Sequence, residues 1–167
     1  MPAYFANSSA VFFKGDKPLD FGKKLKDGKR ILGDGKTFEG TLGGLFLGTF
    51  VGFLQYLLYK KYFTILANNE FIQYSIFFGF VISLGAMLGD IVESFIKRRL
   101  NIKRGGEIIW DKLDFLFGSI ILGYLFCASQ MLFLNIYHFI FLLIITPFVH
   151  KLFNVIAFDL KLKDVSW

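Results

Sequence analysis

The stretch TLGGLFLGTFVGFLQYLLY, from Thr41 to Tyr59, holds 19 consecutive residues without a charged side chain. A second uncharged run of 19 residues extends from Phe71 to Gly89, and a third of 36 residues extends from Phe115 to His150. The hydrocarbon core of a bilayer is about 30 Å thick, and a helix of roughly 20 residues crosses it. The first two runs therefore predict one membrane crossing each.

The third run is too long for a single crossing and is polar in its middle, at Asn135, Tyr137 and His138. We therefore predict two helices there, roughly Phe115–Leu134 and Tyr137–Ala157. With 54% hydrophobic residues and 23 Phe among 167 residues, the chain is too apolar for one modest soluble core. The predicted fold class is all-α, a polytopic membrane helical bundle with four full spans.

The basic residues predict the orientation of this bundle. Of 19 Lys and Arg residues, eight precede Thr41, six lie between Asp90 and Asp114, three lie in the tail from Lys151, and only two lie in the loop 60–70. This asymmetry places the N-terminal segment, the 90–114 loop and the C-terminus in the cytoplasm. It also accounts for the net charge of +6, so we expect a multi-pass cell-membrane protein and no nucleic-acid partner.

One domain, 1–167, is the simplest organisation. It comprises a polar cytoplasmic segment (1–39), a first helical hairpin (40–89), a charged cytoplasmic active-site loop (90–114) and a second hairpin (115–157). Cys127 is the only cysteine, which excludes a disulfide framework and a cysteine-based metal site. The first hairpin carries small-xxx-small spacings that predict close helix packing, at Gly40, Gly44, Gly48 and Gly52.

Carboxylates gather where the second uncharged run ends. On a continuing helix, offsets of 0, 3, 4, 7 and 8 fall on one face, and these are the offsets of Asp90, Glu93, Ser94, Lys97 and Arg98. Acidic residues at a membrane border are costly and contribute little to topology, so they indicate function. The alternative is a set of border charges and ordinary ion pairs.

Asp111 and Asp114 are spaced i, i+3 at the start of the next predicted helix. Two helix ends that carry carboxylates could meet and hold Mg²⁺, a hard cation that prefers carboxylate and phosphate oxygens. Lys97 and Arg98 would then neutralise phosphate oxygens nearby.

A glycine-rich stretch, GDGKTFEG at 33–40, lies before the first hairpin. It is not a Walker A loop, because Arg30 stands where that motif needs a glycine and no strand is predicted before it. A turn with Lys36 at a helix N-terminus can still bind phosphate through backbone N–H groups. A plain helix-start loop is the alternative.

Six motifs in order resemble the CDP-archaeol synthases, the archaeal cytidylyltransferases that act on a lipid phosphate. The segment 89–114 is also similar to the CDP-diacylglycerol synthases, although 104–110 lacks their Pro-Gly-His-Gly-Gly sequence, which favours the archaeal branch. That family usually has a further apolar helix before Pro2, giving five spans. The motifs are Pro2–Asn7, Asp20–Gly22, Asp27–Arg30, Gly33–Gly40, Gly89–Arg99 and Asp111–Phe115.

The resemblance implies CTP and 2,3-di-O-geranylgeranylglyceryl 1-phosphate as substrates, Mg²⁺ as cofactor, and unsaturated CDP-archaeol and pyrophosphate as products. It assigns catalytic roles to Asp90, Asp111, Asp114 and Lys97. The implied metal ligands are Asp90 and Asp111, with Asp114 and Glu93 as neighbours. The implied nucleotide- and phosphate-binding residues are Lys36, Thr37, Ser94, Lys97 and Arg98.

Four alternatives remain at the level of sequence. One is a CDP-alcohol phosphotransferase, whose motif opens as Asp27-Gly28 does, although its later Gly and Asp spacing does not follow. A related enzyme could act on a diacyl lipid phosphate instead. A small multipass transporter would place charges deep in its spans, and the three uncharged runs contain none. A non-catalytic scaffold would explain the glycine spacing and leave the clustered acids unexplained.

Overall fold

The described part of the chain is built from helices. The structure is a computed structural model that describes residues 1–10, 12–13, 15–66, 74–102, 109–132 and 134–159. In chain order its elements are α1 (Pro2–Ser9), α2 (Phe38–Leu66), α3 (Ile76–Arg99), the 3₁₀ helix η1 (Ile109–Lys112), α4 (Asp114–Phe126), α5 (Ala128–Met131) and α6 (Ile136–Asp159). These residues contain no strand, in agreement with the all-α prediction.

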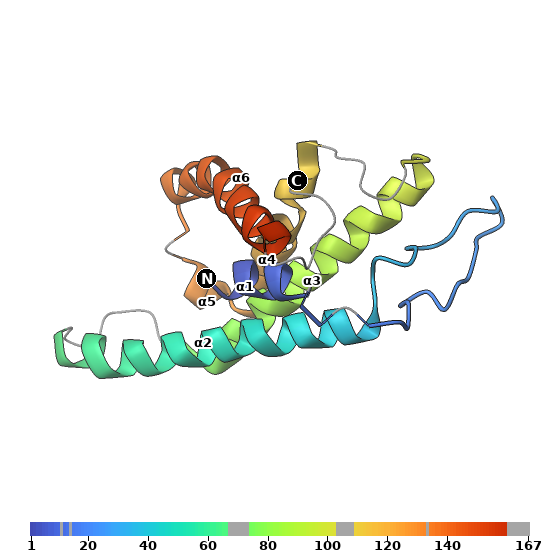
Figure 1. The fold of residues 1–167 in the computed structure, drawn as a ribbon. Coiled ribbons are helices and arrows are strands. Elements are labelled where there is room, and N and C mark those ends of the chain that lie inside the picture. Colours follow the sequence, from blue (N-terminus) through green and yellow to red (C-terminus); the bar gives the residue numbers. More distant parts are fainter. Residues whose placement is uncertain (11, 14, 67–73, 103–108, 133, 160–167) are drawn as a thin grey trace.

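Helix α3 is the centre of the bundle and packs against α1, α2 and α4 (Figure 1). Small residues allow this packing: a Cβ atom added to Gly52 of α2 would lie only 2.7 Å from the Cα of Gly79 of α3. The two backbones are therefore in direct contact, and the predicted close packing of the glycine spacing is confirmed. The buried core comprises Ala3, Ala6, Ala86, Met87, Phe115 and Leu116.

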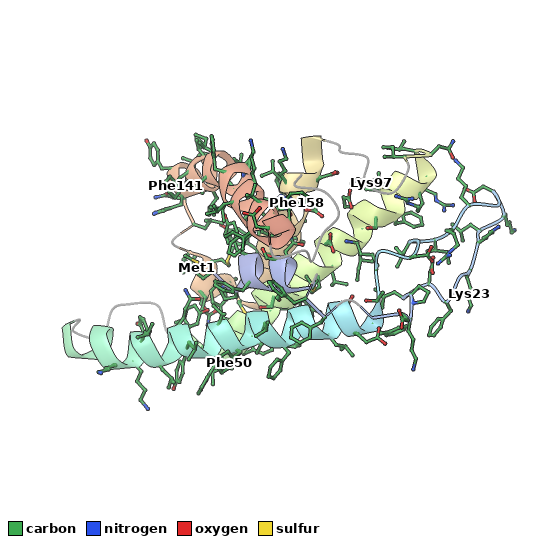
Figure 2. All side chains as sticks on the ribbon, in the orientation of Figure 1. Met1, Lys23, Phe50, Lys97, Phe141 and Phe158 are labelled. Atoms are coloured by element: carbon green, nitrogen blue, oxygen red, sulfur yellow. The ribbon has the colours of Figure 1, made fainter. Side chains whose placement is uncertain are left out.

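Among the described residues, three helices are long and apolar enough to cross a membrane, namely α2 over Phe38–Lys61, α3 over Ile76–Arg99 and α6 over Ile136–Ile156. Their outer faces carry exposed apolar side chains, such as Phe50 on α2 and Phe141 on α6 (Figure 2). Exposed apolar surface of this extent is unfavourable in water and is satisfied by lipid tails.

The predicted continuous helix Phe115–Leu134 is wrong. Helix α4 ends at Phe126, because the backbone of Cys127 leaves the helical region (φ −138°, ψ 41°). The short α5 then returns toward α4, where Gly123 leaves room for the sulfur of Met131. At about 1.5 Å per residue, the 13 residues of α4 extend about 20 Å, which is shorter than a full crossing.

The polar segment before α2 folds into a long loop that reaches the end of α3 (Figure 1). Two isolated bridges, Pro18 with Thr37 and Lys24 with Arg30, pair its outgoing and returning halves. The loop is preceded by α1, which packs into the core between α2 and α3 rather than extending into solvent.

Candidate active site

The site begins where α3 and α4 touch through their backbones. A Cβ atom added to Gly89 would collide with the carbonyl group of Asp114 and lie 3.1 Å from the Cα of Phe115. Only a glycine fits at this contact. Its consequence is that Asp114, the first residue of α4, lies against the turn of α3 that carries Asp90 and Glu93.

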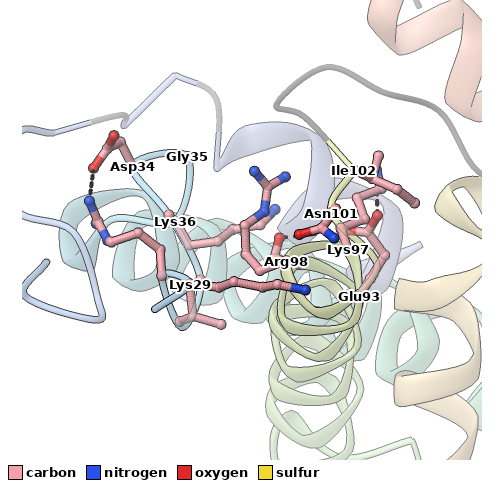
Figure 3. Close-up of a pocket in the computed structure, with 13 residues that line it drawn as sticks. Lys29, Asp34, Gly35, Lys36, Glu93, Lys97, Arg98, Asn101 and Ile102 are labelled. Atoms are coloured by element: carbon pink, nitrogen blue, oxygen red, sulfur yellow. Dashed lines mark hydrogen bonds and ion pairs between the residues drawn. The ribbon is translucent and has the colours of Figure 1, made fainter. Parts of the chain in front are cut away.

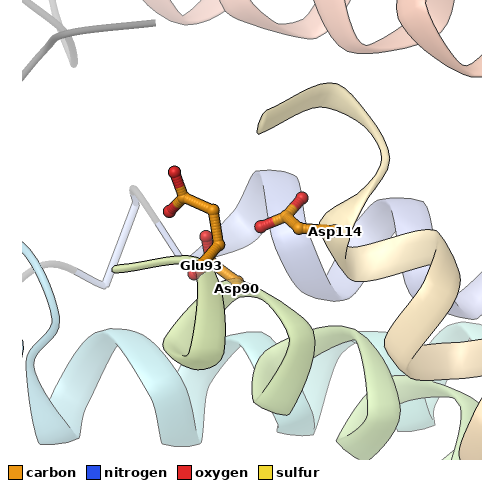
Figure 4. A group of neighbouring side chains, drawn as sticks. All are labelled: Asp90, Glu93 and Asp114. Atoms are coloured by element: carbon orange, nitrogen blue, oxygen red, sulfur yellow. The ribbon is translucent and has the colours of Figure 1, made fainter. Parts of the chain in front are cut away.

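Three carboxylates meet at this contact (Figure 4). Single oxygen atoms of Asp90, Glu93 and Asp114 all lie within 4.8 Å of one another. Two come from successive turns of one face of α3, as the predicted helical offsets require, and the third comes from α4. The prediction that α3 continues through Asp90 to Arg99 is thus confirmed.

The cluster fits a divalent cation. The Oδ1 atom of Asp114 is buried, and none of the described residues forms a hydrogen bond to it. A set of three carboxylates in which one oxygen lacks a donor suits a hard cation such as Mg²⁺, which would both satisfy that oxygen and stabilise the ionised form.

Two lysines neutralise part of this negative charge. The Nζ of Lys36 lies 2.5 Å from Asp90, and the Nζ of Lys97 lies 2.5 Å from both Glu93 and Asp111. The structure therefore places Asp111, on η1, beside the cluster through a shared lysine rather than within the group of three. All four acids named from the sequence lie in one neighbourhood.

A basic cavity of about 490 Å³ opens on one side of this neighbourhood (Figure 3). It lies between the returning half of the N-terminal loop and the last turns of α3. The Nε of Arg98 is buried and has no hydrogen-bond partner among the described residues, so it can donate to a ligand. The charged and polar side chains that line it are Lys29, Arg30, Asp34, Lys36, Glu93, Ser94, Lys97, Arg98 and Asn101.

Four of the five predicted phosphate-binding residues line this cavity, and Thr37 does not. The hydroxyl oxygen of Thr37 accepts hydrogen bonds from the backbone N–H of Gly40 (3.1 Å) and of Gly15 (3.3 Å). It thus caps the N-terminus of α2 and fastens the loop to it. Ser94 lines the cavity and donates to Glu93 at 3.4 Å.

Sequence reasoning did not assign Lys29 or Arg30 to the site. Both line the cavity, because the loop folds back over the end of α3. The Nζ of Lys29 donates to the backbone oxygen of Arg99 at 2.9 Å, and Arg99 in turn pairs with Asp27 at 2.6 Å. The only signal available was their presence in the Asp27–Arg30 motif between two glycine-containing turns.

An apolar cavity of about 630 Å³ lies on the other side of the acids. Helices α3 and α4 form its walls, with Val92, Ile96 and Ile121 among the lining residues, and Glu93, Asp111 and Asp114 at its polar end. Glu93 lines both cavities. A hydrocarbon-lined groove and a cation-lined pocket thus meet at the carboxylates.

Comparison with known proteins gives one consistent answer. The family model described as "CarS-like: CDP-archaeol synthase" matches residues 1–167. The chain is similar to the CDP-archaeol synthases of Pyrococcus abyssi (42% identity, covering 100% of this chain and 94% of the relative) and Sulfolobus acidocaldarius (43%, 100% and 93%). It is also similar to that of Methanocaldococcus jannaschii (41%, 100% and 93%).

A solved structure gives the same indication for the fold. It is described as giving structural insight into an intramembrane enzyme for archaeal membrane lipids biosynthesis, and it is 38% identical in sequence. The TM-score is 0.63, over 74% of this chain and 72% of that one. The helical arrangement seen here is therefore shared with an enzyme that works inside the membrane.

Proposed function

Because the chain belongs to the CDP-archaeol synthase family, we propose that it transfers CMP from CTP to the phosphate of 2,3-di-O-geranylgeranylglyceryl 1-phosphate. The family makes it a cytidylyltransferase of archaeal lipid synthesis. The proposal for its site depends on one observation: a basic cavity and an apolar cavity, with Glu93 in both linings, meet at the acid cluster.

Each cavity matches one substrate. A triphosphate carries several negative charges and needs cationic donors, which Lys29, Arg30, Lys36 and Arg98 supply in the basic cavity. Isoprenoid chains need a hydrocarbon lining, which the groove between α3 and α4 supplies. The lipid phosphate would then lie at the polar end of the groove, beside the nucleotide.

The reaction needs positioning and charge neutralisation rather than a strong base, since the lipid phosphate is already anionic at neutral pH. One of its oxygens attacks the α-phosphorus of CTP and forms a new P–O bond. The bond from the α-phosphorus to the oxygen shared with the β-phosphorus breaks, and pyrophosphate leaves with that electron pair. Lys97 and Arg98 stabilise the negative charge on the phosphate oxygens.

We propose that Asp90, Glu93 and Asp114 hold Mg²⁺, and that Asp111, paired with Lys97, lies beside them without belonging to the group of three. When bound, the metal neutralises phosphate oxygens and stabilises the leaving pyrophosphate. The supporting observations are the 4.8 Å grouping and the buried carboxylate oxygen of Asp114 that lacks a partner.

The topology is part of the same proposal. The chain forms one domain in the cell membrane with its site facing the cytoplasm, which the basic residues of the N-terminal segment and of the loop 90–114 support. Helix α4 and the short α5 together make the fourth crossing, broken at Cys127. A cytoplasmic site suits the substrates, because CTP is soluble and the lipid stays in the bilayer.

The test uses the purified full chain with CTP labelled on its α-phosphate, Mg²⁺, and either the isoprenoid ether phosphate or a diacyl phosphate. We expect label in the lipid extract with the isoprenoid substrate. Asp90→Asn should lower the rate by about 10³-fold, whereas Asp159→Asn, an exposed acid at the end of α6, should leave it unchanged. If neither substrate gives labelled lipid, the proposal is refuted. If only the diacyl phosphate gives labelled lipid, the reaction is of the bacterial type.

A further inference from the structure

Asp20 is an acid that takes no part in the proposed reaction, and its carboxylate accepts several hydrogen bonds. Its side chain is completely inaccessible to solvent, although its neighbours Phe21 and Lys23 are exposed. Hydrogen bonds from Arg30 hold the pKa of Asp20 well below its usual range, against the opposing effect of burial. The carboxylate is therefore a fixed negative charge inside the loop.

Five donors converge on this carboxylate. The Arg30 guanidinium donates from Nε at 3.1 Å and from Nη2 at 2.7 Å, one bond to each oxygen. The backbone N–H groups of Gly22, Leu32 and Gly33 each donate at 3.0 Å. Asp20 thus joins its own turn to the returning half of the loop, 12 and 13 residues further along the chain.

The part of the loop that Asp20 holds is a wall of the basic cavity. Residues 32–36 all line that cavity, and their turn includes Gly33 with a φ of +89°. Arg30, held by Asp20, uses its remaining Nη1 to pair with Asp34 at 2.9 Å on the far side of the turn. Asp20 therefore fixes the first half of the turn that leads to Lys36.

We propose that Asp20 is a positioning residue that sets the conformation of the 32–36 turn, and so determines the affinity for the nucleotide without contacting it. The inference rests on the proposed function, because it takes the basic cavity to be the nucleotide site. Asp20 lies outside both cavity linings, so its loss should act on one substrate only.

The first test compares Asp20→Asn with Asp16→Asn, an exposed acid of the same segment that does not line the cavity. In Asp20→Asn the KM for CTP should rise about tenfold, while kcat and the KM for the lipid phosphate stay within about twofold. Asp16→Asn should change none of the three constants. An unchanged KM for CTP in folded Asp20→Asn, or an equal rise for both substrates, would overturn the proposal.

A second pair of variants changes the backbone of the loop and keeps the Asp20 side chain. Gly33 and Gly28 have similar left-handed φ angles, +89° and +76°, and a Cβ at either would meet no atom closer than 3.8 Å. Alanine therefore strains the backbone equally at both positions. Gly33→Ala should weaken CTP binding, and Gly28→Ala, outside the cavity lining, should not; equal effects would contradict the inference even if Asp20→Asn fails to fold.

Direct binding of CTP with Mg²⁺, measured by equilibrium dialysis, separates this inference from the proposed function. If the wild-type chain binds CTP but makes no labelled lipid, the proposed reaction fails, and weaker binding by Asp20→Asn and Gly33→Ala would still support the inference. If the wild-type chain makes lipid and both variants bind CTP as tightly as it does, the inference alone fails.

Discussion

Replacing Gly89 with alanine would place a methyl group in the contact between α3 and α4. The added carbon would lie 2.8 Å from the carbonyl carbon of Asp114 and 3.1 Å from the Cα of Phe115, and closer still to the carbonyl oxygen of Asp114. All three atoms belong to backbone, so no side chain can rotate away. The two helices must separate at the point that brings Asp114 to Asp90.

The size of the effect follows from these distances. Carbon atoms in contact prefer a separation of about 3.5–4.0 Å, so the helices must part locally by about 0.5–1 Å. A displacement of about 1 Å in a catalytic group costs about 10²-fold in rate, and overpacking a tight contact costs about 1–3 kcal/mol of stability. We therefore expect kcat of Gly89→Ala to fall about 10²-fold in protein that remains folded.

The matched control is Gly79→Ala, which overpacks α3 against α2 away from the acids. Its Cβ would lie 2.8 Å from the Cα of Gly52, so it should cost similar stability while the acid cluster keeps its geometry. Initial rates per folded molecule and thermal unfolding are measured for both variants. A wild-type kcat in Gly89→Ala would refute the reasoning, and an equal loss in Gly79→Ala would show that general destabilisation is the cause.

Three further changes test the remaining parts of the site. Chelation of divalent cations should abolish turnover and added Mg²⁺ should restore it; turnover in excess chelator would contradict the metal assignment to the cluster. Lys36 lines the basic cavity, and its ammonium group lies 2.5 Å from Asp90. Lys36→Met removes this positive charge and should raise the KM for CTP about tenfold in initial-rate assays. An unchanged KM would show that Lys36 does not bind the nucleotide. Ile121→Trp should narrow the apolar cavity and raise the KM for the lipid about fivefold with no change for CTP, whereas Leu125→Trp, exposed and outside the lining, should not; equal effects would contradict the lipid assignment.

The sequence was sufficient to predict the helical face that carries Asp90, Glu93, Ser94 and Lys97. No glycine or proline interrupts 90–99, so the 3.6-residue periodicity of the preceding span continues through the charged residues. The meeting of Asp114 with Asp90 was also predictable as a possibility. The meeting itself depends on the contact of Gly89 with the α4 backbone. That contact is part of the tertiary structure and cannot be read from the periodicity of the sequence.

Two features were outside the reach of sequence reasoning for physical reasons. The break at Cys127 lies in a long uncharged run with no glycine or proline at that position, and it depends on Met131 packing back against Gly123. Asp20 has the sequence environment of an exposed loop acid. Its burial results from pairing with Arg30 and the 32–33 backbone across a long loop, which only the folded chain brings together.

Under the proposed function, the position of the acid cluster follows from the two substrates that would meet there. A water-soluble nucleotide cannot enter hydrocarbon, and the chains of a lipid phosphate cannot leave it, so the reacting groups would meet where one helix changes from apolar to charged. Helix α3 makes this change between Gly89, the last residue of its uncharged run, and Asp90. The missing side chain of Gly89 admits the start of α4, and with it Asp114, at the same level. The close helix contact at Gly89 and the change in polarity at Asp90 thus fall on adjacent residues. If the contact or the first charged residue lay elsewhere on α3, the carboxylates would be separated from one of the two cavities.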